Sequence, residues 1–178
     1  MSNKITYKYG ISRPFHFAKC VGILTGDYLD VAAVPDDVAP IDGSENVYPS
    51  KEILLVLAGS FQLQTPEAGN IDLNAGDMSS SHRYKSAIKI VATADGSSYV
   101  CVTPNDNSFW DRQSGFIANG DTLEITTPAE AADAYVYVGE GGVVDAEGNP
   151  QLVGAFIRVS GGITLTATAD TYFIHMWK

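Results

Sequence analysis

Hydrophobic and polar residues alternate along much of this chain, and the pattern is clearest over residues 52–77. The first half of this stretch is apolar at every second position except Gly59, while the positions between are apolar up to Val56 and polar from Ser60 onward. The apolar series consists of Ile53, Leu55, Leu57, Phe61 and Leu63. This pattern predicts a strand that is buried on both faces at its start and half exposed later, followed by a turn at Pro66 and a returning strand.

Short alternating segments of the same kind recur through the rest of the chain, separated by turn residues. No long amphipathic helix interrupts them, which favours an all-β fold, either a jelly-roll-like sandwich or a barrel. We expect a single β-sandwich domain over residues 1–178, with an amino-terminal arm or edge strand at 1–20 and a long loop at 35–51. Residues 104–134 form a predicted insertion with one or two short helices.

Two segments of this insertion carry signals for the start of a helix. Asn107 or Ser108 is a candidate N-cap for the first helix. Thr127-Pro128-Ala129-Glu130 has a capping-box arrangement with proline at the first helical position, which predicts a second helix of a turn or two.

The balance of charge excludes some classes of partner. Lysine and arginine number 11 against 21 aspartate and glutamate residues, so the formal net charge is -10. Such a surface repels nucleic-acid phosphates and anionic lipid headgroups, so neither nucleic acid nor membrane is an expected partner. The amino terminus has no apolar segment of signal-peptide length, and no run approaches the length of a membrane helix. We therefore expect a cytoplasmic protein or one carried in a virion.

The chain has 2 cysteines, Cys20 and Cys101, and each lies in an apolar run. This position favours two buried thiols that pack as small hydrophobic side chains. A single disulfide between them remains open.

Residues 43–103 resemble the core of a cupin. The first motif of that family ends in a glutamate followed, after six residues, by a glycine, and Glu52 and Gly59 have this spacing. Gly76-Asp77 matches the pair that opens the next strands in cupins, and His82 loosely matches the histidine of their second motif. The resemblance implies a small jelly-roll barrel with a pocket between its sheets. The candidate ligand-binding residues of that pocket are Asn46, Tyr48, Glu52 and His82.

The metal-binding part of the cupin pattern is not matched. Metal cupins carry two histidines, one residue apart, just upstream of the glutamate, where this chain has Asn46 and Tyr48 or, with a longer spacing, Glu45 and Val47. Only 3 histidines exist in the chain. A transition metal prefers three or four well-placed donors, so we expect neither a metal nor another cofactor.

The leading hypothesis is a non-enzymatic structural, assembly or binding protein. Catalytic donors do not converge in the sequence, and its Thr-, Ala-, Gly- and Asp-rich texture is similar to that of phage accessory structural proteins. Such a protein is expected to form a homo-oligomer and to contact other virion proteins. The candidate interface is the amino-terminal arm, with Tyr7, Tyr9, Phe15 and Phe17.

Two alternatives remain open, although the residues lean against catalysis. One is a cupin-type enzyme or a binding protein for a sugar or small acid, with its pocket between the sheets. The other is a carbohydrate-binding module that uses exposed aromatic residues such as Trp110. His175 beside Trp177 is predicted to be a packed residue at the edge of the core.

Overall fold

The computed structural model describes residues 1–5, 10–12, 14–33, 39, 52–66, 69–79, 85–106 and 108–178. The chain divides into two compact units, Met1–Ser108 (unit 1) and Phe109–Lys178 (unit 2). The division falls within residues 104–134, which were predicted to be an insertion into one domain. Each unit has a core of its own.

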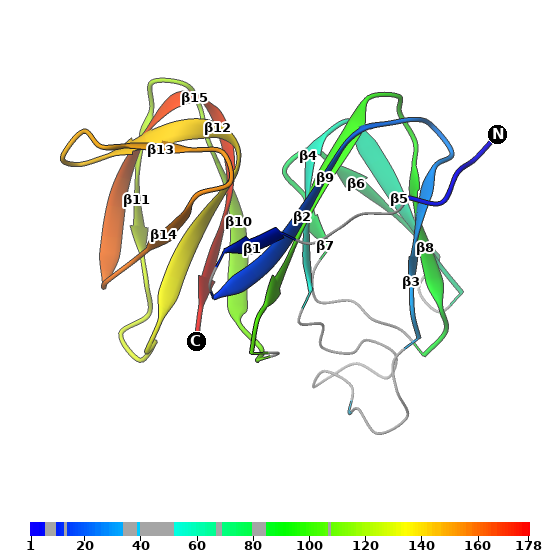
Figure 1. Cartoon of the computed structure of the whole chain (residues 1–178), viewed down its shortest axis with the longest axis horizontal. Helices are drawn as coiled ribbons and strands as arrows, with labels where there is room; N and C mark the ends of the chain where they lie inside the picture. Colours follow the sequence, from blue (N-terminus) through cyan, green and yellow to red (C-terminus); the bar gives the residue numbers. More distant parts are fainter. Residues whose placement is uncertain are drawn as a thin grey trace. The chain divides into compact units, whose positions relative to one another are not determined.

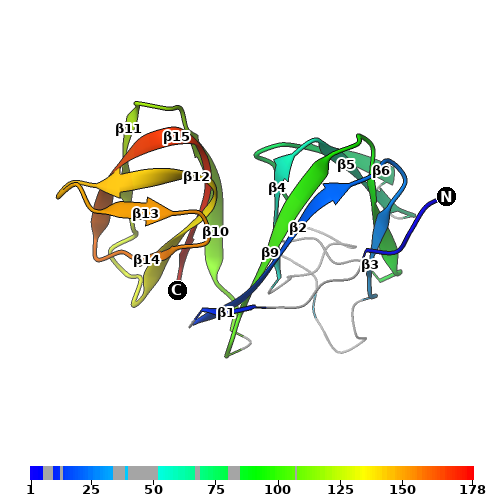
Figure 2. The same cartoon turned by 45° about the horizontal axis from the view of Figure 1, so that its top comes forward.

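Unit 1 consists of two antiparallel sheets (Figure 1). The five-stranded sheet has the order β1 (Gly10–Ser12), β2 (Phe15–Ile23), β9 (Ser97–Pro104), β4 (Ile53–Ala58) and β7 (Met78–Ser79). The four-stranded sheet has the order β3 (Tyr28–Val31), β8 (Ile88–Ala92), β5 (Ser60–Thr65) and β6 (Gly69–Asn74). Figure 2 shows β2, β9 and β4 side by side, as their pairing requires.

Buried side chains from both sheets form one core inside unit 1, which is the arrangement of a sandwich. Its members are almost all apolar, and they alternate along each strand because successive side chains point to opposite faces. They are Ile23, Leu29, Leu54, Val56, Phe61, Leu63, Leu73, Ile88, Ile90, Ala92, Tyr99 and Cys101.

The apolar series of residues 52–77 does not share one face, and Gly59 is the reason. This residue has a φ of 68°, and a Cβ there would meet the Ser97 Cα at 2.8 Å. The chain therefore leaves one sheet and enters the other at Gly59. Before the glycine, Leu54 and Val56 enter the core, and after it Phe61 does. The predicted hairpin that follows is confirmed, with Leu63 opposite Ile71 and Phe61 opposite Leu73.

Unit 2 contains a six-stranded antiparallel sheet, and two long strands organise it. These are β12 (Ala134–Asp145) and β15 (Gly162–Trp177), which pair with each other. Strand β15 also pairs with β10 (Asp111–Ile117) and β11 (Thr122–Thr126). Strand β12 also pairs with β13 (Pro150–Leu152) and β14 (Phe156–Arg158). Each long strand thus takes part in three ladders. The buried residues of this sheet form a core of mainly Val, Ala, Leu, Ile and Phe side chains.

An irregularity in β12 depends on a second glycine. The pairing of β12 with β15 shifts register between Val138 and Val143, and Gly141 in this stretch has a φ of 84°. A Cβ at Gly141 would meet the Asp170 carbonyl oxygen. The Thr171 hydroxyl accepts a hydrogen bond from the Gly142 N–H at 3.1 Å and lies 3.0 Å from the Gly142 carbonyl oxygen, so it supports the backbone where the ladder is interrupted.

The prediction of one or two short helices is wrong, because none of the described residues is helical. At the first segment the Asp106 carboxylate accepts a hydrogen bond from the Ser108 N–H at 3.0 Å, and strand β10 follows. At the second, the N–H groups of Ala132 and Asp133 donate to the Lys178 carbonyl oxygen instead of to a preceding helical turn. The local capping signals therefore do not start a helix here, because backbone groups pair with distant residues instead. The described ranges also hold no helix suited to crossing a membrane.

Candidate functional site

Of the four residues predicted to line a pocket between the sheets, Glu52 is the one that the structure describes. It lies directly before β4 and is half buried, so it is not the fully solvated strand-start residue that its type favours. Asn46, Tyr48 and His82 lie outside the described residues. Their grouping with Glu52 stays a prediction.

Glu52 lies near a polar cluster in the core of unit 1. Burial raises the pKa of the Tyr99 phenol above its ordinary value, and the neighbouring Cys101, Cys20 and Glu52 add to the shift. The Tyr99 ring packs edge-on against Phe61, with 5.6 Å between the ring centroids. The phenol therefore stays protonated at neutral pH, and its ring belongs to the core of unit 1.

The two cysteines are free thiols, and Cys101 is buried while Cys20 is half buried. In the pairing of β2 with β9, Cys20 is opposite Tyr99 and Cys101 is opposite Ala18, so the cysteines are diagonal neighbours. Diagonal pairs are about 7–8 Å apart, which is beyond the Cα separation of most disulfides. The geometry therefore favours two packed thiols outside a disulfide, as the sequence indicated.

The structure describes half of the predicted amino-terminal interface. Tyr7 and Tyr9 lie outside the described residues. Phe15 is fully buried within its own chain, so it exposes no surface to a neighbouring subunit, and Phe17 is half buried. The proposal that Trp110 is an exposed sugar-stacking residue is wrong, because Trp110 is buried and its ring packs against Tyr135.

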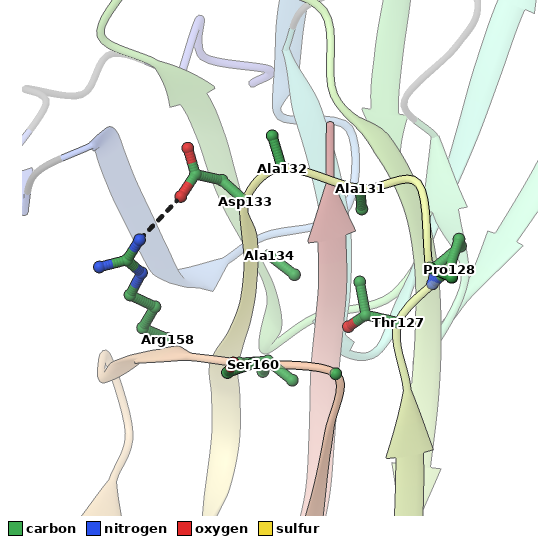
Figure 3. Close-up of a pocket in the computed structure, with 11 residues that line it drawn as sticks. Thr127, Pro128, Ala131, Ala132, Asp133, Ala134, Arg158 and Ser160 are labelled. Atoms are coloured by element: carbon green, nitrogen blue, oxygen red, sulfur yellow. Dashed lines mark hydrogen bonds and ion pairs between the residues drawn. The ribbon is translucent and has the colours of Figure 1, made fainter.

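An open cleft of about 490 Å³ lies in unit 2. One side is the turn after β11, residues 127–134, and the other is the segment 158–161 after β14 (Figure 3). Its walls carry mainly small side chains, among them Pro128, Ala131 and Ala134. Volumes of this size accommodate small organic ligands.

Backbone hydrogen bonds hold both walls of the cleft in place. The Thr127 N–H donates to the Gly161 carbonyl oxygen at 2.9 Å, and the Val159 N–H donates to the Ala134 carbonyl oxygen at 2.9 Å. Asp133 and Lys178 exchange two hydrogen bonds of 3.0 Å. The cleft is therefore built on strand ends and does not depend on a long unsupported loop.

An ion pair occupies one end of the cleft. The Arg158 Nη2 lies 3.1 Å from the Asp133 Oδ1, and the side chains are 72% and 38% exposed. Figure 3 shows the two side chains facing each other from opposite walls. Exposed pairs of this kind contribute little to stability and are screened by salt.

A second polar contact lies behind the wall at Thr127. The Thr127 hydroxyl is 3.1 Å from the His175 Nε2, and the imidazole stacks on Trp177 with 4.8 Å between ring centroids. Burial lowers the pKa of His175, so the ring is neutral at pH 7. The prediction that His175 is a packed residue at the edge of the core is confirmed. The contact fixes the start of the turn.

Asp133 and Arg158 were not among the site residues predicted from the sequence. They are 25 positions apart and meet because β14 pairs with β12, which places Arg158 opposite Tyr135. No local spacing signals this meeting. The one sequence feature that could have indicated this site is an isolated arginine at the end of a short apolar segment.

Within the part of the chain that the structure describes, no three His, Cys, Asp or Glu residues form a group suited to holding a metal ion. The cleft can offer a ligand one guanidinium, one carboxylate, the hydroxyls of Thr127 and Ser160 and a set of methyl groups. This combination suits reversible binding.

No family model matches the chain, and no curated protein does. Solved structures match its fold. A conserved protein of unknown function from Pseudomonas aeruginosa is 13% identical, with a TM-score of 0.55 over 92% of this chain and 79% of that one. AerE from Microcystis aeruginosa is 11% identical, with a TM-score of 0.54 over 96% and 90% of the two chains. A cupin 2 conserved barrel domain protein from Leptotrichia buccalis is 11% identical, with a TM-score of 0.48 over 97% and 88%.

These matches are likenesses of fold alone. The two antiparallel sheets of unit 1 agree with the fold that the resemblance of residues 43–103 implies. An antiparallel two-sheet fold is therefore confirmed for the described part of unit 1, and it carries no activity.

Proposed function

We propose that this chain is a non-enzymatic binding protein on a cupin-like scaffold, and that the cleft of unit 2 is its ligand site. The observation that supports this most is the open cleft of about 490 Å³, whose walls are anchored by backbone hydrogen bonds. Small-molecule sites are usually preformed concave spaces of about this size.

The polar groups of the cleft favour binding over catalysis. Its carboxylate faces a guanidinium, and the Thr127 hydroxyl is held against a buried imidazole whose ring stacks on Trp177. An activated nucleophile needs a base that a third group orients toward it. Among the described residues, the His175 imidazole also contacts the Trp177 ring. This contact does not supply the group that would orient the imidazole as a catalytic base.

A fragment library screened by ligand-observed NMR tests the proposal, with Ala131→Phe as a variant that fills the cleft. Binding is expected for the wild type and is lost in this variant, because the new ring occupies the space between the walls. Ala75→Phe is the matched control, since Ala75 is exposed in a turn of unit 1. If no fragment binds, or if binding persists in Ala131→Phe, the ligand site is not this cleft.

Assembly is a second candidate function, and large apolar side chains at the surface favour it. Phe116 on β10, Leu123 on β11 and Leu152 on β13 are 49%, 38% and 73% exposed. Association of copies would cover such side chains. Light scattering after size exclusion tests this, and a strict monomer at micromolar concentrations contradicts a homo-oligomer. A role beside other virion proteins stays a prediction from composition.

The cupin-type enzyme remains the competing hypothesis for unit 1. Elemental analysis of protein purified without added metal separates the two ideas. Stoichiometric iron, manganese, nickel or zinc that is lost in Glu52→Gln would favour the enzyme and contradict a purely binding role.

A further inference from the structure

We propose that the cleft of unit 2 recognises a small monocarboxylic acid, whose carboxylate takes the place of Asp133 on Arg158. This inference rests on the proposed function, since it assigns a ligand class to the same cleft. In the absence of ligand, the Asp133 carboxylate then occupies the position of the ligand carboxylate on Arg158.

The Arg158 guanidinium is exposed enough for a ligand carboxylate to bind it. Its contact with Asp133 involves the Nη2 at 3.1 Å, and the side chain is 72% exposed. A guanidinium has five donors in a planar fork and binds carboxylates through two parallel hydrogen bonds. A ligand that reaches the rim of the cleft can therefore form a two-point contact with Arg158.

The exchange requires little rearrangement. Arg158 ends β14, where its backbone is paired opposite Tyr135, and Asp133 is held by its two backbone hydrogen bonds with Lys178. The anchors of both side chains thus stay in place, and only the Asp133 carboxylate has to rotate away. An exposed ion pair contributes little to stability, so its replacement by a ligand carboxylate costs little.

The rest of the cleft selects for an acid with an apolar body and one charge. Pro128, Ala131 and Ala134 line the walls with apolar groups. The formal net charge of -10 opposes the approach of multiply charged phosphates or polycarboxylates more than that of a single carboxylate. One guanidinium at the rim is also enough for one carboxylate.

Titration calorimetry with butanoate and 3-phenylpropanoate tests the assignment, with butanamide and 3-phenylpropanamide as neutral controls. Both acids are expected to bind more tightly than their amides. Arg158→Gln is expected to weaken acid binding about tenfold, since a charge-assisted contact is lost. Asp133→Asn is expected to tighten it about threefold, because the competing carboxylate is removed. Arg158→Lys should give an intermediate affinity.

A second exposed ion pair provides a matched control for charge. Lys4 and Asp30 in unit 1 are 2.8 Å apart, with side chains 56% and 42% exposed. Lys4→Gln and Asp30→Asn change the net charge by the same amounts and should leave acid binding unchanged. Circular dichroism verifies that every variant is folded.

The opposite signs expected for the two partners make the inference falsifiable. Unchanged affinity in Arg158→Gln, weaker affinity in Asp133→Asn, or amides that bind as tightly as acids would each overturn the carboxylate assignment. Those results leave the cleft as a binding site if fragments still compete there. Absence of acid binding together with a fragment screen that finds no ligand overturns the proposed function as well.

Discussion

The two units differ in where the structure describes buried cores and an open cleft. In the described part of unit 1, large side chains such as Phe61 and Tyr99 pack in the core, and the cupin-like motif residue Glu52 lies near Tyr99. Unit 2 has a core of its own, and an open cleft lies at the end of its strands, where no family motif falls. Resemblance to a motif therefore indicates a scaffold. An open cleft whose walls are held by hydrogen bonds indicates a candidate binding site.

The units resemble each other in one respect. Each contains a glycine with positive φ where the backbone of another strand comes close. In unit 1 it is Gly59, against Ser97, and in unit 2 it is Gly141, against Asp170 and Thr171. Both positions are interruptions of a ladder, so neither sheet can keep its register with a larger residue there.

The largest expected effect comes from removing a large side chain from the core of unit 1. Phe61→Ala should lower the free energy of unfolding of unit 1 by about 3–5 kcal/mol, because a buried ring is replaced by a cavity. Hydrogen exchange measured by mass spectrometry on peptides of β5 and β8 checks this. Phe61→Leu is the control and should cost less. If Phe61→Ala leaves the exchange of both strands unchanged, the interior is not packed as described.

The two glycines should respond alike. Gly59→Ala and Gly141→Ala should each reduce the free energy of unfolding by about 2–4 kcal/mol, since left-handed strain adds to a clash with neighbouring backbone. Gly148→Ala is the control, because Gly148 has a φ of 84° but no atom near its missing Cβ. Its cost should be only about 1 kcal/mol. Urea denaturation measures all three, and equal costs would show that close approach contributes nothing.

Acidification should lower the stability of the two units in different pH ranges. Burial lowers the pKa of His175 in unit 2, so between that value and 6.5 the unfolded chain binds more protons and stability falls as the pH drops. The slope cannot exceed about 1.4 kcal/mol per pH unit for one group. In unit 1 the Asn3 N–H lowers the pKa of Asp27 and the Thr25 N–H lowers that of Asp95, so their contributions are lost only below about pH 3.8.

Urea denaturation followed by tryptophan fluorescence reports on unit 2, since both tryptophans, Trp110 and Trp177, belong to it. Stability measured this way should decrease from pH 7 to pH 5 in the wild type and change less in His175→Asn. A flat profile in the wild type would contradict a buried, neutral His175.

The smallest expected effect concerns the stability of the cleft itself. Arg158→Gln and Asp133→Asn should each change the free energy of unfolding by less than about 1 kcal/mol, because both side chains are more than one-third exposed. Thermal denaturation measures this. A larger loss would mean that the pair holds the two walls together. The contrast between the packed core of unit 1 and the open, ligand-ready cleft of unit 2 would then weaken.

Much of the fold follows from local pattern. The alternation in β5, β6 and β8 identified these strands, and Pro66 with Gly69 located the hairpin between β5 and β6. Strand β10 is the longest of the missed elements, since residues 111–117 were expected to lie in a helical insertion. Its pairing with the last strand supplies backbone partners that the local sequence does not reveal.

By itself, the sequence determined the all-β class, the strand-and-turn pattern and the acidic surface, because side-chain alternation and charge are local properties. Only the tertiary structure decided that Gly59 moves the chain between sheets, that Trp110 is buried, and that Asp133 meets Arg158 across a cleft. These outcomes depend on which distant strands pair and in which register. Pairing of that kind results from the summed packing of many residues, and no single segment encodes it.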